Sequence, residues 1–306
     1  MRTYLIIPAA FLVACGGGEK PPAADSTAAA AAAPTTPQRV ATAEGFSTPE
    51  SVIYDNRLRV WFVSNINGSP SAKDGNGFIS RLTGDGAVDS LHFIQGGRGG
   101  VTLNAPKGLA ITGDTLWVTD INVVRGFDRN TGAPVATVDF GRRAIFLNDI
   151  ADTPDSSLII TDTGIIIADS ITHPGPDRIF RLKGRTITVV AEGAHLQGPN
   201  GIVWDNVGKR VIMVPFGGTT IFTGKEGGGA IPMAVGPGQH DGVVVLDGRI
   251  LVSSWADSAI SEIGQTGITK LITGVASPAD IGLDAAGRRL AIPLFTLDRV
   301  EIWKLP

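Results

Sequence analysis

The sequence predicts an all-β fold, a six-bladed β-propeller, from three observations. A short motif that precedes an apolar run occurs six times between residues 49 and 281. Glycine accounts for 40 of the 306 residues, which suits a chain with many tight turns. No stretch of 12 or more residues has the apolar spacing of an amphipathic helix. A repeat of this kind is typical of four-stranded propeller blades.

The repeated motif has the approximate form Pro-x-Gly-apolar. Its second residue falls at Glu50, Lys107, Asn148, Asn200, Asp241 and Ala279. Successive copies are therefore 57, 41, 52, 41 and 38 residues apart. The mean spacing of about 46 residues lies in the range of a propeller blade. A linear β-solenoid is the alternative, but its rungs are usually about half this long.

A β-prone apolar run follows each motif, at residues 60–63, 116–119, 158–161, 211–214, 250–253 and 290–293. Continuous apolar runs are expected for strands that neighbouring blades cover on both faces. Third strands such as 78–82 alternate between apolar and polar residues, which suits one solvated face. We expect residues 40–46 to supply the fourth strand of the last blade and so close the ring.

The first residues resemble the signal sequence of a bacterial lipoprotein. Met1 and Arg2 precede an apolar run over 4–13 that is too short to span a bilayer as a helix. The segment LVACG at 12–16 resembles a lipobox, and Cys15 is the only cysteine of the chain. We therefore expect a cleaved signal peptide and a lipidated Cys15. An ordinary signal peptide with a chance cysteine is the alternative.

Three regions follow from this interpretation: a signal peptide over 1–14, a lipidated tether over 15–38 and the propeller over 39–306. The tether is rich in Ala, Pro, Gly and Thr, so burial cannot offset the entropy of ordering it. Acyl chains on Cys15 would anchor the protein to a membrane. Because Gly16 follows the cysteine, resemblance to sorted lipoproteins favours the outer membrane, facing the periplasm.

The charge balance argues against one class of partner. The chain has 26 basic and 29 acidic residues and a formal net charge of −3. Nucleic-acid-binding surfaces instead concentrate Lys and Arg, so we expect no nucleic-acid partner. Nothing in the sequence identifies a protein partner.

The second motif residues should form a ring, because the innermost strands of all blades line the central channel. Two carboxylates, two carboxamides and a lysine occupy this ring, and Asp149 and Asp280 each follow a ring position. Oxygen ligands from separate strands suit a hard cation such as Ca²⁺. Without a cation, clustered carboxylates would raise one another's pKa. The preference of Asn and Asp for turns is the alternative explanation.

Four motifs resemble the senescence-marker-protein/gluconolactonase/luciferin-regenerating-enzyme family, over about residues 45–306. They are Thr48-Pro49-Glu50-Ser51, Asn148-Asp149, Gly198-Pro199-Asn200-Gly201-Ile202 and His240-Asp241-Gly242. The resemblance implies a six-bladed propeller that hydrolyses sugar lactones. It also implies a divalent ion held by Glu50, Asn200 and Asp241, with Asn148 beside it. We expect Ca²⁺, with Zn²⁺ or Mn²⁺ as alternatives.

The same resemblance implies a mechanism. The ion would polarise the lactone carbonyl, and Asp241 or a water at the ion would provide base and nucleophile. Phe146 stands where the family usually has an arginine that contacts the sugar acid. We expect Lys107, Asp149 and Asp280 to bind substrate; for Lys107, an internal salt bridge is the alternative.

Three weaker signals complete the prediction. The insertion at 65–77 could form a lid over the mouth of the propeller. Asp74-Gly75-Asn76-Gly77 within it is expected to be a turn and not a calcium loop, because Phe78 interrupts the ligand pattern. His240 is expected to be structural.

Two functions remain open from the sequence. One is a divalent-metal-dependent hydrolase of a lactone or related ester, which works at the mouth of the propeller on a small-molecule substrate. The other is a noncatalytic, lipid-anchored propeller that binds a ligand or a protein partner.

Overall fold

The computed structural model describes residues 1, 3, 35–225, 228–264 and 267–306. Cys15, the predicted lipidation site, lies outside the described residues, as does most of the predicted signal peptide and tether. Among the residues that are described, no helix is long and apolar enough to cross a membrane.

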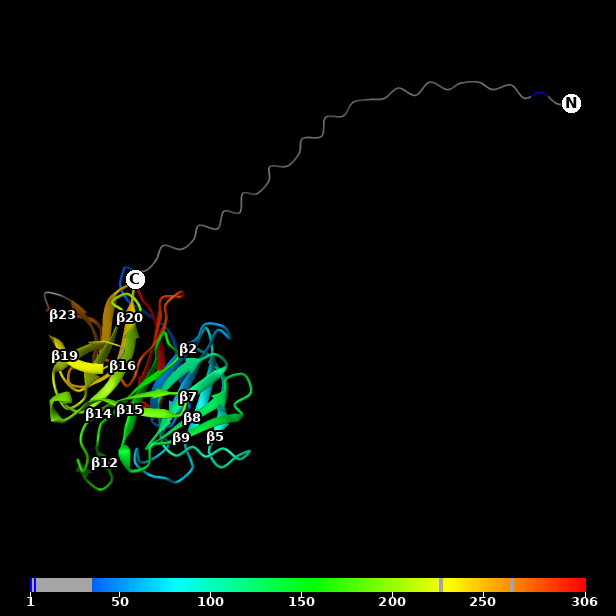
Figure 1. Cartoon of the computed structure of the whole chain (residues 1–306). Coiled ribbons are helices and arrows are strands. Elements are labelled where there is room, and N and C mark those ends of the chain that lie inside the picture. The colour runs from blue at the N-terminus through cyan, green and yellow to red at the C-terminus, as the bar shows by residue number, and fades with distance from the viewer. Residues whose placement is uncertain (2, 4–34, 226–227, 265–266) are drawn as a thin grey trace. The chain divides into compact units, whose positions relative to one another are not determined.

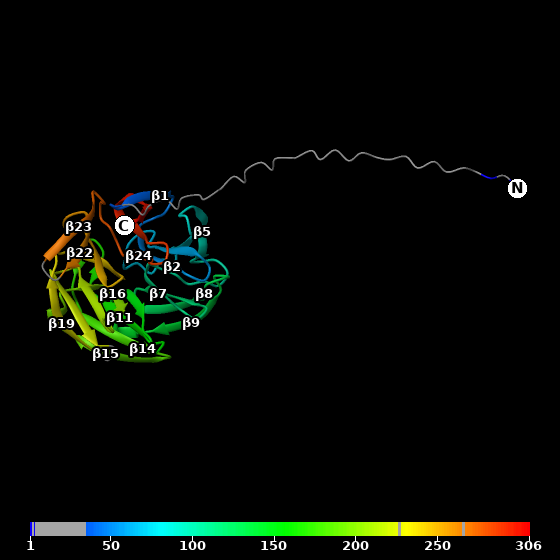
Figure 2. The ribbon, with the colours of Figure 1, turned by 90° about the horizontal axis from the view of Figure 1, so that it is seen from above.

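The described residues form six four-stranded antiparallel sheets arranged as the blades of a propeller (Figures 1 and 2). Blade 1 consists of β2 (Pro49–Asp55), β3 (Val60–Asn65), β4 (Phe78–Thr83) and β5 (Val88–Gln95). Blade 2 consists of β6 (Pro106–Thr112), β7 (Thr115–Asp120), β8 (Val123–Asp128) and β9 (Pro134–Asp139). Blade 3 consists of β10 (Leu147–Asp152), β11 (Leu158–Asp162), β14 (Arg178–Lys183) and β15 (Thr186–Glu192). Blade 4 consists of β16 (Pro199–Asp205), β17 (Arg210–Pro215), β18 (Thr220–Lys225) and β19 (Gly228–Val235). Blade 5 consists of β20 (His240–Leu246), β21 (Arg249–Ser254), β22 (Ala259–Gly264) and β23 (Gly267–Thr273). Blade 6 consists of β24 (Gly282–Asp284), β25 (Arg289–Leu294), β26 (Arg299–Lys304) and β1 (Gln38–Glu44). The predicted fold class is therefore confirmed.

The ring closes because the two ends of the propeller share blade 6. Strand β1 pairs antiparallel with β26, which confirms the predicted origin of the fourth strand. Ala43 and Phe46, at the end of this segment, pack in one cluster with Trp61 of blade 1 and Ile302 of blade 6. The closing segment therefore joins the cores of the last and the first blade.

The core lies between neighbouring blades, as the continuous apolar runs predict. Trp61, Phe62 and Val63 of the second strand of blade 1 are completely buried. Phe140, which follows blade 2, meets Phe180 of blade 3 edge to face, with ring centroids 5.1 Å apart. Each blade thus covers the face of the next one.

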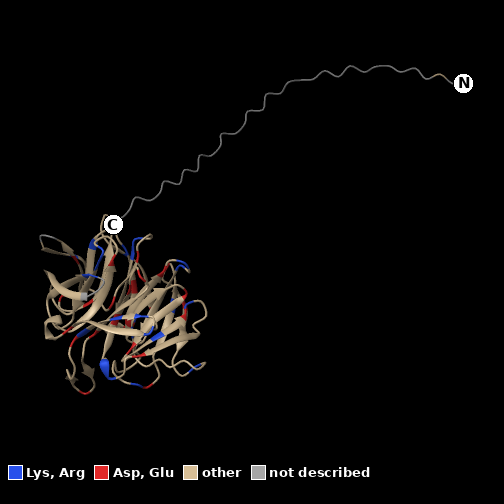
Figure 3. Ribbon diagram, in the orientation of Figure 1, with Lys and Arg blue, Asp and Glu red and all other residues tan. Residues whose placement is uncertain are grey.

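Charged side chains of both signs are interspersed over the propeller (Figure 3). One ion pair lies in the interior: an Arg129 guanidinium nitrogen is 2.8 Å from a carboxylate oxygen of Asp55, and both side chains are buried. This pair links blade 2 to blade 1. Removing one partner of such a pair would leave the other as an uncompensated buried charge and destabilise the fold.

The inner strands of blades 1 to 5 are irregular at the repeated motif. In each of them the register to the second strand shifts within the motif, as between Pro199 and Ile202. Such bulges re-aim side chains and are common beside active sites. Glycine allows the inner strands to converge: a Cβ on Gly201 would lie 2.3 Å from the carbonyl oxygen of Asp241.

Side-chain hydroxyls tie neighbouring inner strands together. The Thr161 hydroxyl accepts a hydrogen bond from the Asp149 amide (2.9 Å) and donates one to the Asn200 carbonyl (2.7 Å). The Ser253 hydroxyl likewise accepts from the Gly242 amide (2.7 Å) and donates to the Ala279 carbonyl (2.9 Å). Each hydroxyl fixes the backbone of a ring residue in the following blade.

Candidate functional site

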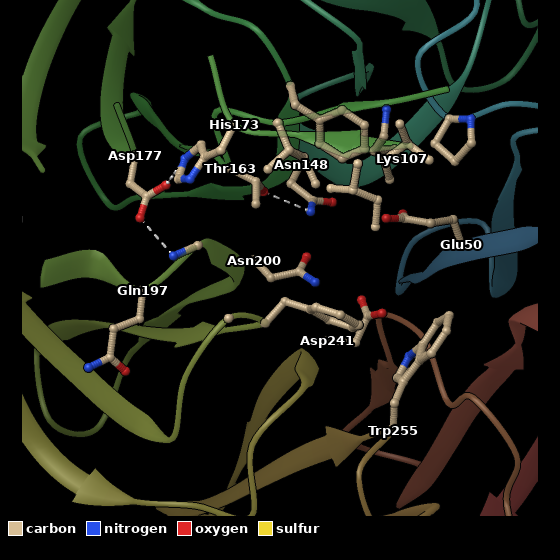
Figure 4. A pocket seen from close by; sticks show the side chains of 18 of the residues that line it. Glu50, Lys107, Asn148, Thr163, His173, Asp177, Gln197, Asn200, Asp241 and Trp255 are labelled. Atoms are coloured by element: carbon tan, nitrogen blue, oxygen red, sulfur yellow. Dashed lines mark hydrogen bonds and ion pairs between the residues drawn. The ribbon is translucent and has the colours of Figure 1, made fainter. Parts of the chain in front are cut away.

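A cavity of about 480 Å³ lies over the ring of second motif residues. Five ring side chains from the inner strands of blades 1 to 5 line it: Glu50, Lys107, Asn148, Asn200 and Asp241 (Figure 4). Ala279, the sixth ring residue, is completely buried and does not reach the cavity. The structure therefore brings together side chains that are up to 191 residues apart in the sequence (241 − 50).

Both ring carboxylates are buried and incompletely paired. Glu50 and Asp241 are only 6% and 4% exposed, and Glu50 Oε2 and Asp241 Oδ1 have no hydrogen-bond partner. Burial raises the pKa of Glu50 well above its ordinary value; Asp241 raises it further, and Lys107 opposes the increase. Buried oxygens without a partner are rare in proteins and call for a proton, a water or a cation.

The pKa of Asp241 is also raised well above its ordinary value, first by burial and then by the charge of Asp280. Trp255 and Asn200 lie near this carboxylate and partly offset the increase in its pKa. The indole nitrogen of Trp255 nevertheless has no partner at hydrogen-bond geometry. Both groups face the cavity (Figure 4).

The two ring asparagines are held through their amide nitrogens. Asn148 Nδ2 donates to the Thr163 hydroxyl (3.1 Å), and Asn200 Nδ2 donates to the His240 carbonyl at the long distance of 3.5 Å. The Asn148 amide oxygen then points away from Thr163 and into the ring (Figure 4). Amide oxygens in this position are potential ligands for a hard cation.

The ring residues fit a divalent cation. Among the described residues there is no group of three or more His, Cys, Asp or Glu side chains that could hold a metal. The ring instead offers two carboxylates and two carboxamides, a mixed oxygen set that hard cations accept. Glu50, Asn148, Asn200 and Asp241 would hold the ion. The unpartnered oxygens of Glu50 and Asp241 are the observation that supports this fit.

Lys107 brings a positive charge into the same ring. Its ammonium group donates to the Ala105 carbonyl (3.1 Å) and lies 4.2 Å from the centroid of the Phe146 ring. Burial lowers the pKa of Lys107 to about 8, although the charges of Glu50 and Asp120 oppose the decrease. None of the ion pairs among the described residues joins Lys107 to Glu50. Lys107 thus brings a buried amine to the wall of the cavity.

Asp149 and Asp280 do not line the cavity. They face the central channel beyond the ring, because successive side chains of a strand point to opposite sides. Asp149 accepts hydrogen bonds from the Ile150 and Ile202 amides, both at 2.6 Å, and Asp280 accepts one from the Ser51 hydroxyl. At these positions they connect the inner strands of neighbouring blades, and a role of theirs in substrate binding stays a prediction.

Two insertions reach the cavity. Ile66 and Pro70 of the first-blade insertion line it, as expected for a lid. The second insertion, 163–177 in blade 3, contains the short strands β12 (Ile166–Ile167) and β13 (Ile171–Thr172). Both backbone groups of Ile167 bond to the first insertion, its carbonyl to the Ser69 hydroxyl (3.1 Å) and its amide to the Ser71 hydroxyl (3.0 Å). The second insertion was not predicted, although the 52-residue spacing between Asn148 and Asn200 indicated it.

The predicted turn in the first insertion is present. Asn76 Nδ2 donates to Asp74 Oδ2 (2.9 Å), and the Gly75 amide donates to Asn104 Oδ1 (3.1 Å). His240 is completely buried: its Nε2 accepts from the Gly238 amide (3.3 Å), and its Nδ1 faces the Pro215 carbonyl (3.3 Å). Burial lowers the pKa of His240. It is thus a structural residue, as expected.

A histidine–carboxylate pair in the cavity wall was missed. His173 Nε2 lies 2.9 Å from Asp177 Oδ1, and the other oxygen of Asp177 accepts from the Gly198 amide (2.7 Å). The Asp177 side chain is 2% exposed and that of His173 is 48% exposed. The four-residue spacing within an insertion was the available signal. The pair fixes the imidazole and leaves Nδ1 free.

Aromatic side chains from three blades form a further wall. Phe216 and Trp255 meet edge to face with ring centroids 5.5 Å apart, and Trp255 and Phe295 are 5.2 Å apart. All three line the cavity. Phe295 begins the short 3₁₀ helix η3 (Phe295–Leu297). These three aromatic residues were not predicted as part of the site; each directly follows the last residue of the second strand of its blade.

No model of a protein family matches the sequence, and no curated protein matches it. Solved structures do match. A gluconolactonase from Xanthomonas campestris is 16% identical, with a TM-score of 0.64, over 86% of this chain and 88% of that one. A putative gluconolactonase is 17% identical, with a TM-score of 0.64, over 89% and 93% of the two chains.

A third match is a catalytically inactive virginiamycin B lyase from Staphylococcus aureus, solved with quinupristin. It is 15% identical, with a TM-score of 0.57, over 89% of this chain and 99% of that one. These TM-scores establish a shared fold, and at identities this low they establish the fold alone. The fold that the motif resemblance implied is therefore confirmed.

Asp280 should make the stability of the folded domain depend on pH. Burial raises the pKa of Asp280 to about 7, whereas an aspartate in an unfolded chain titrates at about 3.9. Its contribution to stability is therefore complete below about pH 4 and is lost as the pH rises through about 7. In the presence of EDTA we expect Tm to fall between about pH 5.5 and about pH 8, and to fall less in Asp280→Asn, measured by calorimetry.

Asp85→Asn is the matched control, because the Asp85 side chain is 97% exposed. It should show the same pH dependence as the unmodified protein. If Asp280→Asn also showed it unchanged, the assignment of this pH dependence to Asp280 would be wrong.

Proposed function

We propose that the protein is a divalent-cation-dependent hydrolase of a lactone or a related ester, and that the reaction takes place over the ring. The observation that carries the proposal is the pair of buried, unpartnered oxygens on Glu50 and Asp241 beside Asn148 and Asn200. The shared fold with gluconolactonases supports the reaction class. Ca²⁺ is the preferred ion because the available ligands are oxygens.

Each ring residue has a role in this proposal. The cation, when bound, would polarise the ester carbonyl. Asp241 takes a proton from the attacking water, whose oxygen bonds to the acyl carbon. The bond from that carbon to the ring oxygen then breaks, and the ring oxygen takes up a proton, so that the product is a hydroxy acid. Lys107 offers its ammonium to the carboxylate that forms.

The second candidate is a propeller that binds a ligand without turning it over. The cavity supports it as well, since a volume of about 480 Å³ is large enough for a small molecule. The two candidates differ in turnover, and the ring variants below separate them.

Glu50→Ala should lose both the cation and the activity, because alanine leaves no ligand oxygen at this position and removes one of the two anionic ligands. We expect less than one bound divalent ion per chain and a fall in lactone hydrolysis of at least about 100-fold. Metal content by mass spectrometry and hydrolysis by a pH-indicator assay measure the two effects. Glu44→Ala, at an exposed glutamate on β1, is the control. Full metal content in Glu50→Ala would exclude Glu50 as a ligand.

Asp241→Asn should separate binding from chemistry. Asparagine keeps an oxygen ligand but cannot accept the proton of the attacking water, so the variant should retain much of the metal and lose hydrolysis by about 100-fold or more. Metal content and turnover are measured on one sample. Turnover equal to that of the unmodified protein would show that another group is the base.

We also propose that Cys15 carries the lipid that anchors the protein to the bacterial outer membrane. The proposal rests on the segment LVACG and on Cys15 being the only cysteine. In bacterial cells, Cys15→Ser should abolish labelling by a fatty-acid probe and move the protein from the membrane to the soluble fraction. A Cys15→Ser protein that is still labelled would disprove lipidation at this residue.

A further inference from the structure

We infer that the substrate is a lactone or ester with an extended apolar group, and not a polyhydroxylated sugar lactone. The inference rests on the proposed hydrolase function and adds the substrate class. The cavity walls above the ring have a different chemistry from the ring itself.

The walls are mainly apolar. The two insertions contribute Ile66, Pro70, Ile165, Ile167 and Ile171, and Phe216, Trp255 and Phe295 form the aromatic wall. Phe146 adds a further ring beside Lys107. The site therefore has a polar floor at the ring and apolar walls on several sides.

Most polar side chains in these walls are already engaged with the protein. Thr163 donates to the Pro199 carbonyl (2.8 Å) and accepts from Asn148 (3.1 Å). The Gln197 amide uses both ends on Thr220, at 3.2 and 3.3 Å. Both carboxylate oxygens of Asp177 have partners, as described above. Two wall nitrogens, His173 Nδ1 and the indole nitrogen of Trp255, have no partner among the described residues.

This distribution selects against hydroxyl-rich ligands. A sugar lactone would bury several hydroxyl groups against walls that offer few free donors or acceptors, and each hydroxyl left unpaired on burial weakens binding. An alkyl or aryl group would instead gain from every methylene that it removes from water. The entrance continues the pattern, because Ile166 and Ile171 of the second insertion are 41% and 70% exposed.

A series of δ-lactones tests the inference: δ-valerolactone, δ-octalactone and δ-decalactone, with glucono-δ-lactone as the polar member. Ring size and ester bond are constant, so the substituent is the variable. We expect kcat/KM to rise by about fourfold for each added methylene until the chain fills the cavity. Glucono-δ-lactone should be the poorest substrate.

Variants of the walls locate the effect. Ile167 lies in the partly exposed second insertion, and Ile167→Ala should reduce kcat/KM about tenfold more for δ-decalactone than for δ-valerolactone. Ile231→Ala is the matched control, since Ile231 is 62% exposed on β19 and does not line the cavity. It should retain the full preference for long chains.

Alkylcyclohexanones with the same substituents provide a readout that needs no turnover. They keep the ring and the carbonyl but lack the ester bond, and their binding can be followed by quenching of Trp255 fluorescence, with Trp255→Phe as the blank. Affinity should rise with chain length in the unmodified protein, and less steeply in Ile167→Ala.

The possible outcomes distinguish the two proposals. If no lactone is opened but the ketones bind with this chain-length dependence, the hydrolase proposal fails and the apolar site stands. If glucono-δ-lactone is opened as fast as δ-decalactone, the hydrolase proposal stands and the substrate class is wrong. Affinity independent of chain length would also overturn the inference.

Discussion

The convergence of the inner strands on one axis is the constraint on which the site depends. Strands from different blades approach so closely that a Cβ on Gly242 would lie 2.4 Å from the Ile281 amide nitrogen. Hydroxyls such as that of Thr161 lock this approach by bonding to two inner strands at once. Polar side chains on these strands must then share a small volume from which water is largely excluded. The shifted pKa values of the ring residues are therefore a consequence of the closure of the propeller.

The electrostatics of the ring are therefore unfavourable for folding and favourable for binding. The charge of Asp241 raises the pKa of Glu50, and the charge of Lys107, whose own pKa burial lowers, opposes only part of the increase. Proteins retain such local conflicts mainly at functional sites, where a bound ligand resolves them. Burial raises the pKa of Asp149 and of Asp280 as well, but these two carboxylates also accept hydrogen bonds from backbone amides or from a hydroxyl.

The sequence predicted the blades and the ring because both are periodic. Each ring residue occupies the same place in a repeat, so the closed fold brings Glu50 and Asp241 together whatever the loops do. The walls could not be predicted in this way. Trp255 lies in a connection after a second strand, and the pairing of Ile167 with Ser69 and Ser71 joins insertions 96 or more residues apart. Asp149 does not line the cavity, because a one-residue step along a strand reverses the direction of its side chain.

The pairing of β1 with β26 has a consequence for how the molecule forms. Arg39 and Glu301, joined across these strands at 2.9 Å, are 262 residues apart. Chain-closing contacts of such high sequence separation are slow to form, because loop entropy must be overcome before they stabilise anything. A nascent chain that has not yet delivered β26 leaves blade 6 incomplete and the flank of blade 1 bare. The protein should accordingly fold after synthesis rather than during it, as a single cooperative unit.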